Sequence, residues 1–139
     1  MSDKQFILCC IPARYHSTRL PGKPLLQINE KSIIQHVYQR VTSTKVDKII
    51  VLTDDNRIYQ EVISFGGNCQ IINEECLNGT DRIICYLEKY FLKNKSKPLN
   101  NQDPLIINVQ GDEPFVNPSH IDQCIDYFTQ SSKNNCKCY

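Results

Sequence analysis

The 139-residue chain has 40% hydrophobic and 22% charged residues, which is the composition of a single globular domain with a buried core and not of a disordered protein. Its formal net charge of +1 offers no overall electrostatic surface for nucleic acid or an anionic membrane. The longest apolar runs, of about six residues, are far shorter than the roughly 20 that a membrane-spanning helix needs, and residues 1–5 lack a signal-peptide pattern. The sequence therefore predicts a cytoplasmic protein without nucleic-acid or membrane partners.

Short apolar runs alternate along the chain with helical patterns, which is typical of βαβ units and a mostly parallel sheet. The first run, residues 6–11, predicts a strand buried on both faces, and Pro12 removes a backbone donor at its end. We therefore expect an α/β fold, with an open, mostly parallel sheet flanked by helices. The next segment should leave from the carboxyl edge of this strand, where open α/β sheets bind ligands.

That segment, residues 12–25, is rich in proline and carries three permanent positive charges. Arg14 and Arg19 could grip phosphate oxygens through bidentate forks, and Lys23 could act as a mobile point charge. Gly22 would let backbone amides approach the anion closely. The pattern favours a triphosphate ligand, although the same charges could also be an ordinary solvated surface. The chain lacks the glycine patterns of P-loop and dinucleotide-binding proteins.

The following elements continue the alternation. Ser32 with Gln35 forms a capping box ahead of a helix, and Asp54 to Asn56 favours the start of a second helix. Thr80 is the expected cap of a third helix, and Asn117 followed by Pro118 predicts a fourth. The expected strands between these helices are residues 49–53, 69–72 and 105–109. The inward positions expected in the last two helices are Ile83, Ile84, Leu87 and Phe91, and then Ile121, Cys124, Ile125 and Phe128.

Two further segments carry polar residues where the predicted strands end. Asp112, in the turn Gln-Gly-Asp-Glu-Pro of residues 110–114, would face a triphosphate and could bind Mg²⁺. It could equally be a turn former. Residues 78–82, Asn-Gly-Thr-Asp-Arg, lie at a loop-to-helix junction where backbone amides could bond a pyrimidine edge or ribose. The same string is also a good helix start without any ligand.

The eight cysteines mostly fall inside predicted strands and helices and are read as small buried side chains in a reducing compartment. Cys136 and Cys138 have the wrong spacing for a zinc knuckle, and the three histidines are scattered. We therefore expect no zinc site. The polar residues 93–103 predict a surface loop, and residues 130–139 predict a polar, poorly ordered tail of the single domain 1–139.

Three motifs together resemble 3-deoxy-manno-octulosonate cytidylyltransferase, also called CMP-Kdo synthetase. They are residues 12–25, residues 108–114 (Asn-Val-Gln-Gly-Asp-Glu-Pro) and residues 79–82 (Gly-Thr-Asp-Arg). The resemblance runs from about Phe6 to about Phe128, the amino-terminal half of such enzymes. It implies a nucleotide-diphospho-sugar transferase-like fold and transfer of CMP from CTP to 3-deoxy-manno-octulosonate, with release of pyrophosphate, in lipopolysaccharide biosynthesis.

The resemblance also implies roles for individual residues. Catalysis would rest on Arg14, Lys23 and Asp112, with Asp112 as the Mg²⁺ ligand. The implied nucleotide-binding residues are Ala13, Arg14, Arg19, Lys23, Asn78, Gly79, Thr80 and Gln110. Asn78 stands where the family commonly has serine, and Glu113 is assigned to structure.

Because the family's proteins are nearly twice as long, the chain is expected to be truncated. The missing half would hold much of the sugar pocket, a second metal carboxylate and the dimer interface. Three readings stay open: an active enzyme, completed by a homodimer or by a complementing carboxyl-terminal half; a nucleotide-binding remnant; and a cytidylyltransferase for another acidic sugar such as sialic acid. A sugar transferase on the same fold would need an Asp-x-Asp motif, which the chain lacks.

Overall fold

A computed structural model describes residues 5–91 and 103–133 and shows a four-stranded parallel sheet. The strands are β1 (Ile7–Pro12), β4 (Lys48–Thr53), β5 (Cys69–Ile71) and β6 (Leu105–Asn108), in the order β5-β4-β1-β6. Cys10 of β1 lies opposite Ile50 on one side and Asn108 on the other. The expected α/β architecture with an open parallel sheet is confirmed.

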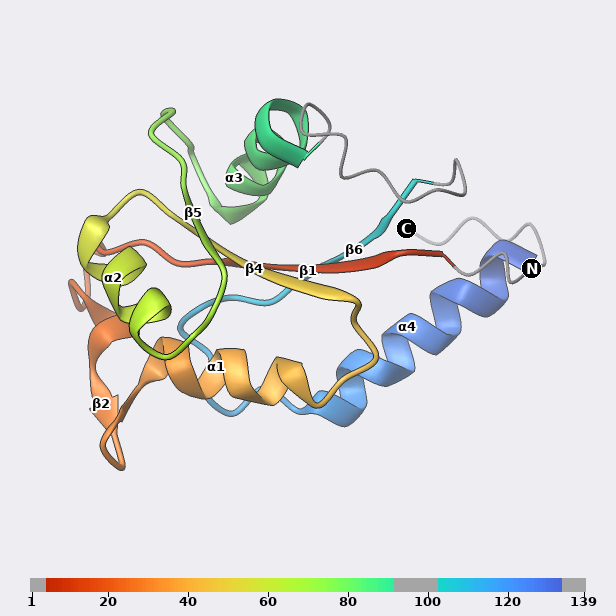
Figure 1. The fold of residues 1–139 in the computed structure, drawn as a ribbon, viewed down its shortest axis with the longest axis horizontal. Coiled ribbons are helices and arrows are strands. Elements are labelled where there is room, and N and C mark those ends of the chain that lie inside the picture. Colours follow the sequence, from red (N-terminus) through yellow and green to blue (C-terminus); the bar gives the residue numbers. More distant parts are fainter. Residues whose placement is uncertain (1–4, 92–102, 134–139) are drawn as a thin grey trace.

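Helices cover both faces of this sheet (Figure 1). Helices α1 (Ile33–Thr42), α2 (Asn56–Ser64) and α4 (Pro118–Lys133) pack on one face. Helix α3 (Gly79–Tyr86), which continues into a π-helical turn, Leu87–Phe91, packs on the other. A short 3-10 turn, Lys23–Leu25, and a hairpin of β2 (Gln27–Ile28) and β3 (Lys31–Ser32) connect β1 to α1.

The alternation of side chains along the strands separates two hydrophobic cores, because successive residues of a strand point to opposite faces. Cys9 and Ile11 join the core under α1, α2 and α4, whereas Leu8 and Cys10 join the core under α3. The run 6–11 is therefore apolar throughout because the strand is covered on both faces, as its pattern predicts. Burial raises the pKa of the Cys9 and Cys10 thiols to about 12, so both behave as buried apolar groups, as expected.

Side-chain caps begin the helices at nearly the expected residues. Ser32 caps α1, where its hydroxyl accepts from the Gln35 amide at 3.2 Å, and Asn117 accepts from the Ser119 amide at the start of α4. The expected cap of α3 is wrong by two residues, since Asn78, not Thr80, accepts from the Asp81 amide at 2.9 Å. Asparagine is among the strongest N-cap residues, and here it precedes the glycine that starts the helix.

Other sequence expectations fail in detail. Ile84, Cys124 and Phe128, which were expected to face inward, are exposed, whereas Tyr86 and Arg82 are buried. The β2–β3 hairpin was not predicted, because its turn has no glycine and places Asn29 and Glu30 at positive φ.

Helix α4 continues to Lys133 and so takes in the start of the expected tail, 130–139. Residues 134–139 and all but the last residue of the expected loop 93–103 lie outside the described residues. None of the helices in residues 5–91 and 103–133 is long and apolar enough to cross a membrane.

Candidate active site

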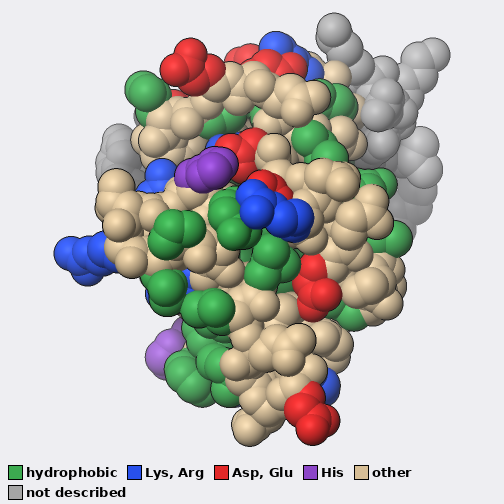
Figure 2. Space-filling model, turned by 90° about the vertical axis from the view of Figure 1, so that its left-hand side faces the viewer, with side chains coloured by type: hydrophobic (Ala, Val, Ile, Leu, Met, Phe, Trp, Pro, Cys, Tyr) green, Lys and Arg blue, Asp and Glu red, His purple; other side chains and the backbone are tan. Residues whose placement is uncertain are grey.

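A pocket of about 510 Å³ opens at the carboxyl edge of the sheet. Basic, acidic and histidine side chains lie side by side on this end of the molecule (Figure 2). The chain segments that follow β1, β4 and β6, together with the start of α3, supply the walls. The lining residues are Pro12, Ala13, Arg14, His16, Ser17, Lys23, Pro24, Asp54, Cys76, Leu77, Asn78, Gly79, Thr80, Arg82, Gln110 and Asp112.

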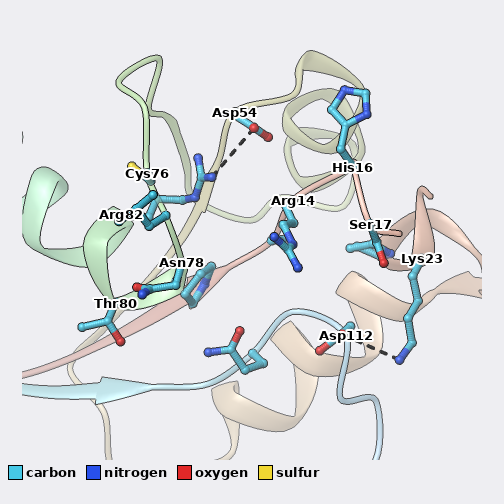
Figure 3. A pocket seen from close by; sticks show the side chains of 16 residues that line it. Arg14, His16, Ser17, Lys23, Asp54, Cys76, Asn78, Thr80, Arg82 and Asp112 are labelled. Carbon is cyan, nitrogen blue, oxygen red and sulfur yellow. Dashed lines mark ion pairs between the residues drawn. The ribbon is translucent and has the colours of Figure 1, made fainter. Parts of the chain in front are cut away.

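One wall carries an exposed ion pair. The Lys23 Nζ lies 3.7 Å from the Asp112 Oδ2, and the two side chains are 42% and 49% exposed. A pair this exposed adds little to stability, because water screens both charges. Figure 3 shows the two side chains facing each other at one side of the pocket. The ammonium and the carboxylate are therefore available to a ligand, at little cost in folding free energy.

The loop that carries Arg14 and Lys23 is held in shape by Tyr15. The Tyr15 carbonyl accepts from the Gly22 amide at 2.7 Å, and Gly22 has a φ of +74°. A Cβ added at Gly22 would lie 2.8 Å from Tyr15 Cε2. The Arg57 guanidinium covers the ring, 3.3 Å from its centroid. The loop therefore closes around one aromatic ring that α2 holds in place.

Arg57 is itself oriented by Asp55. Its Nη2 lies 2.8 Å from the Asp55 Oδ2, and the Asp55 Oδ1 accepts from the Arg57 amide at 2.8 Å as the cap of α2. The hydrogen bond from the Arg57 side chain lowers the pKa of the Asp55 carboxyl below its ordinary value. The Asp55 carboxylate therefore both caps α2 and orients the Arg57 guanidinium that covers the Tyr15 ring.

The turn after β6 brings Asp112 into the pocket through a close backbone contact. The Gly111 amide donates to the Pro12 carbonyl at 3.0 Å. A Cβ at Gly111 would lie 2.7 Å from the Ala13 Cβ, so only glycine fits without displacement of the segment after β1. Gln110 beside it donates to the Asn108 side chain at 3.1 Å and is exposed to the pocket.

The opposite wall is formed by α3. Asn78, Gly79 and Thr80 line the pocket from the first turn of this helix. Asn78 uses its side-chain oxygen as the helix cap. The NH₂ group of the Asn78 side chain is therefore the group left to face a ligand.

Arg82 stands one turn further along α3 and is buried although it lines the pocket. Its Nη2 lies 3.8 Å from the Asp54 Oδ2; the Arg82 side chain is 7% exposed and that of Asp54 is 39% exposed. The Arg82 Nη1 is buried without a hydrogen-bond partner. Figure 3 shows this pair on the α3 side, away from Lys23 and Asp112.

The structure brings together all but one of the site residues predicted from the sequence. Ala13, Arg14, Lys23, Gln110 and Asp112 line the pocket with Asn78, Gly79 and Thr80. Arg19 does not line it and is exposed on the surface.

Sequence reasoning missed several lining residues, of which Arg82 and Asp54 are the most polar. The available signal was that Asp54 directly follows a predicted strand and that Arg82 belongs to the motif of residues 79–82. A charged residue in the first turns of a helix is by default expected on the surface, so this motif alone did not indicate burial.

The carboxylates in the pocket fit a magnesium ion that takes most of its ligands from nucleotide phosphates and water. Within the described residues no group of three or more His, Cys, Asp or Glu side chains could hold a metal ion. Mg²⁺ commonly uses only one or two carboxylates, with phosphate oxygens and water as its other ligands. Asp112 could supply one such carboxylate.

Comparisons with known proteins agree with this architecture. The sequence model of the family described as cytidylyltransferase matches residues 8–137, further than the expected limit near Phe128. The chain is 49% identical over 122 residues to the 3-deoxy-manno-octulosonate cytidylyltransferase of Cytophaga hutchinsonii. It is 45% identical over 120 residues to that of Thermodesulfovibrio yellowstonii. It is also 46% identical over 119 residues to the 8-amino-3,8-dideoxy-manno-octulosonate cytidylyltransferase of Shewanella frigidimarina.

Among solved structures, the chain resembles CMP:2-keto-3-deoxy-manno-octonic acid synthetase complexed with CTP, with a TM-score of 0.78 and 35% identity. The alignment covers 93% of this chain and 49% of that one. The three curated relatives are covered over 45–46% of their length against 85–87% of this chain, so the chain spans about half the length of the relatives it matches. The family model, in contrast, extends over nearly the whole sequence, and the chain therefore belongs to the cytidylyltransferase family.

Proposed function

We propose that this chain forms the nucleotide-binding part of an enzyme that transfers CMP from CTP to 3-deoxy-manno-octulosonate. One observation carries the proposal. A single pocket at the carboxyl edge of the sheet joins the cationic loop, the start of α3 and the turn with Asp112. The name of the similar CTP-bound synthetase and the names of the curated relatives support it.

Arg14 and Lys23 would bind the triphosphate. Both line the pocket, and the ion pair that the Lys23 side chain makes within the described residues is the exposed one with Asp112. Phosphate oxygens can replace that carboxylate as the partner of the ammonium at little cost, since the pair is weak in water. Arg19 does not line the pocket, so a direct contact with the nucleotide would require movement of the loop.

The α3 wall would bind the cytidine. Asn78, Gly79 and Thr80 present short side chains and backbone at the start of the helix, on the side away from Lys23 and Asp112 (Figure 3). Gln110 and Ala13 lie at the carboxyl ends of the two strands between these walls. We assign Gln110 to the ribose or the acidic sugar.

Asp112 would hold the Mg²⁺ ion with the phosphates. The bound ion would neutralise charge on the phosphate oxygens at the reacting phosphorus. Lys23, released from its pair with Asp112, would then stay with the phosphates.

The transfer itself requires no covalent enzyme intermediate. The anomeric hydroxyl oxygen of the sugar forms a bond to the α-phosphorus of CTP, and the bond between this phosphorus and the bridging oxygen of pyrophosphate breaks. The hydroxyl proton passes to solvent, and pyrophosphate leaves with the bonding electrons. Arg14 and Lys23 would stabilise the charge that develops on pyrophosphate, so positioning and charge neutralisation account for catalysis.

Relatives at almost equal identity are named for two sugars, 3-deoxy-manno-octulosonate and its 8-amino-3,8-dideoxy form. The 8-amino sugar is therefore the second candidate substrate, and sialic acid is a third that the first motif alone allows. If the half of the enzyme that this chain represents cannot catalyse the transfer, the alternative is a remnant that binds the nucleotide without turnover. A homodimer or a complementing carboxyl-terminal half would restore the rest of the site.

The test combines binding with turnover. Calorimetric titration of the chain with CTP and Mg²⁺ measures binding, and a pyrophosphate assay with each sugar measures transfer. The proposal expects CTP binding together with pyrophosphate release that depends on 3-deoxy-manno-octulosonate. Binding without release for any sugar, even after a carboxyl-terminal half is supplied as a second chain, selects the remnant. Release only with another sugar reassigns the substrate.

A further inference from the structure

We propose that Arg57 is a positioning residue for triphosphate binding, which acts from outside the pocket by fixing the Tyr15 ring and, through this ring, the place of Lys23. The inference rests on the proposed function, in which Lys23 binds the triphosphate. Arg57 itself does not line the pocket. Its influence on a bound nucleotide therefore runs through other residues or through its long-range charge, and these two routes can be told apart.

The first link joins Arg57 to the Tyr15 ring. The Arg57 Cζ lies 3.3 Å from the ring centroid, so the guanidinium is in direct contact with the ring face. A guanidinium in this place is attracted by the negative charge of the π face. Tyr15 is only partly buried, so the contact with Arg57 restrains a ring that the core alone does not enclose.

The second link joins the ring to Lys23. The Gly22 amide donates to the Tyr15 carbonyl at 2.7 Å, and a Cβ at Gly22 would lie 2.8 Å from Tyr15 Cε2. The ring edge therefore lies directly against the Gly22 backbone. The Gly22 carbonyl accepts from the Leu25 amide at 2.9 Å and so begins the 3-10 turn that carries Lys23. A shift of the ring would move Gly22, and with it the start of this turn.

The third link anchors Arg57 to α2. The Arg57 Nε donates to the Asp55 Oδ1 at 3.0 Å, and the Arg57 Nη2 donates to the Asp55 Oδ2 at 2.8 Å. This bidentate pair gives the guanidinium a defined orientation. Helix α2 packs on the sheet and also contacts the 3-10 turn that carries Lys23. The guanidinium is therefore a fixed support, against which the ring and the turn are placed.

The expected size of the effect follows from the strength of the contact with the ring. A loop that is free to leave its binding arrangement binds more weakly, in proportion to the fraction of molecules that still hold the arrangement. A cation–π contact at a partly exposed site corresponds to about fivefold in such an equilibrium. Loss of Lys23 itself, a charged donor to the phosphates, should weaken binding about tenfold or more.

The test measures the affinity for inorganic triphosphate with Mg²⁺ by amide chemical-shift titration, which also follows weak binding. Arg57→Gln removes the cation over the ring, whereas Tyr15→Leu removes the ring and leaves the Arg57 charge in place. Each substitution should lower the affinity about fivefold, and the two together should lower it no more than either alone.

Arg40→Gln is the matched control. Arg40 is exposed on α1, and its Nη1 donates to the Val116 carbonyl at 3.4 Å, so this variant loses the same charge without touching Tyr15. Its affinity for triphosphate should stay within about 1.5-fold of the wild type, because salt screens distant exposed charges.

A second measurement repeats both substitutions in a Lys23→Ala background. If the series of contacts ends at Lys23, Arg57→Gln and Tyr15→Leu should change the remaining triphosphate affinity there by less than about 1.5-fold. General destabilisation of the fold would instead lower the affinity in both backgrounds. The coupling to Lys23 therefore separates a positioning role from a merely structural one.

Each outcome bears on a different claim. If Arg57→Gln binds triphosphate as the wild type does, the inference is overturned while the proposed function stands. It is also overturned if Tyr15→Leu keeps wild-type affinity, since Arg57 would then act through its charge alone, or if the losses are undiminished in Lys23→Ala. If the wild type binds neither CTP nor triphosphate, the proposed function fails, and this inference fails with it.

Discussion

The two walls of the pocket hold their charges in opposite ways. Lys23 and Asp112 face each other across 3.7 Å with nearly half of each side chain exposed. Arg82 and Asp54 are a similar distance apart, at 3.8 Å, but the guanidinium is buried. Exposed charges can exchange partners freely, whereas a buried charge keeps a fixed direction. The wall with Lys23 and Asp112 is therefore suited to binding a mobile, highly charged group. The wall with Arg82 and Asp54 is suited to recognising a rigid group.

The largest expected effect comes from Lys23→Ala on the exposed wall. Pyrophosphate release should fall by about two to three orders of magnitude, because one charged donor to the leaving group is removed. The thermal midpoint of unfolding should not change, because the pair with Asp112 is exposed. Lys31→Ala is the control, since Lys31 lies on the β2–β3 hairpin and bonds to Gln39. Unchanged release in Lys23→Ala would refute the role of this wall.

The next largest effect is expected for Asp112→Asn. Its rate of pyrophosphate release should fall on the order of a hundredfold, because one charge that holds the metal ion is removed. The Mg²⁺ concentration that gives half of the maximal rate should rise as well. Glu113→Gln provides the matched control: this neighbouring carboxylate is exposed and does not line the pocket. If both variants show the same Mg²⁺ dependence, Asp112 is not the metal ligand.

A pair of glycine substitutions separates backbone strain from loop shape. Gly22→Ala and Gly66→Ala both place a Cβ at positive φ, which costs about 1–2 kcal/mol. Only at Gly22 does the new atom also meet a neighbour within 4 Å, the Tyr15 ring at 2.8 Å.

Urea unfolding should therefore show a larger loss for Gly22→Ala than for Gly66→Ala, and CTP affinity should fall only in Gly22→Ala. Equal losses of stability, with CTP affinity unchanged in both, would show that the Tyr15 contact does not shape the loop.

The smallest effect concerns pH. Asp55 has a lowered pKa in the folded state because the Arg57 side chain donates to it. Its stabilising contribution is present above the ordinary pKa of 3.8 and is lost as the pH falls through the lowered value.

Urea unfolding of the wild type and of Asp55→Asn between neutral pH and pH 3 checks this. The difference in unfolding free energy should be largest at neutral pH and should shrink below the ordinary pKa. A difference that grows on acidification would contradict the Asp55–Arg57 interaction.

The sequence predicted the elements that depend on local signals. The run 6–11 and the cap at Ser32 were both readable, because apolar continuity and capping chemistry are properties of neighbouring residues. Most of the pocket followed from one rule, that parallel strands present their carboxyl ends at the same edge. Arg14 and Asp112, almost a hundred residues apart, were brought to one site on this basis.

The failures have a different origin. The burial of Arg82 depends on the packing of α3 and on its ion pair with Asp54, which directly follows β4. Neither feature is visible in the periodicity of the helix that carries Arg82. The exposure of Ile84 on the same helix has the same cause, because the rotation of α3 about its axis decides which residues face inward. The β2–β3 hairpin was missed because Asn29 and Glu30 adopt positive φ without a glycine to mark the turn.

The most direct measurement is a map of amide chemical shifts in this 16.1 kDa chain as CTP and Mg²⁺ are added. We predict that the perturbed amides cluster in three segments, residues 13–23, 78–82 and 110–112. Inorganic triphosphate should shift the first and third segments but leave residues 78–82 nearly unchanged. Perturbations confined to one segment, or spread over surfaces away from the carboxyl edge of the sheet, would contradict a single nucleotide pocket with two distinct walls.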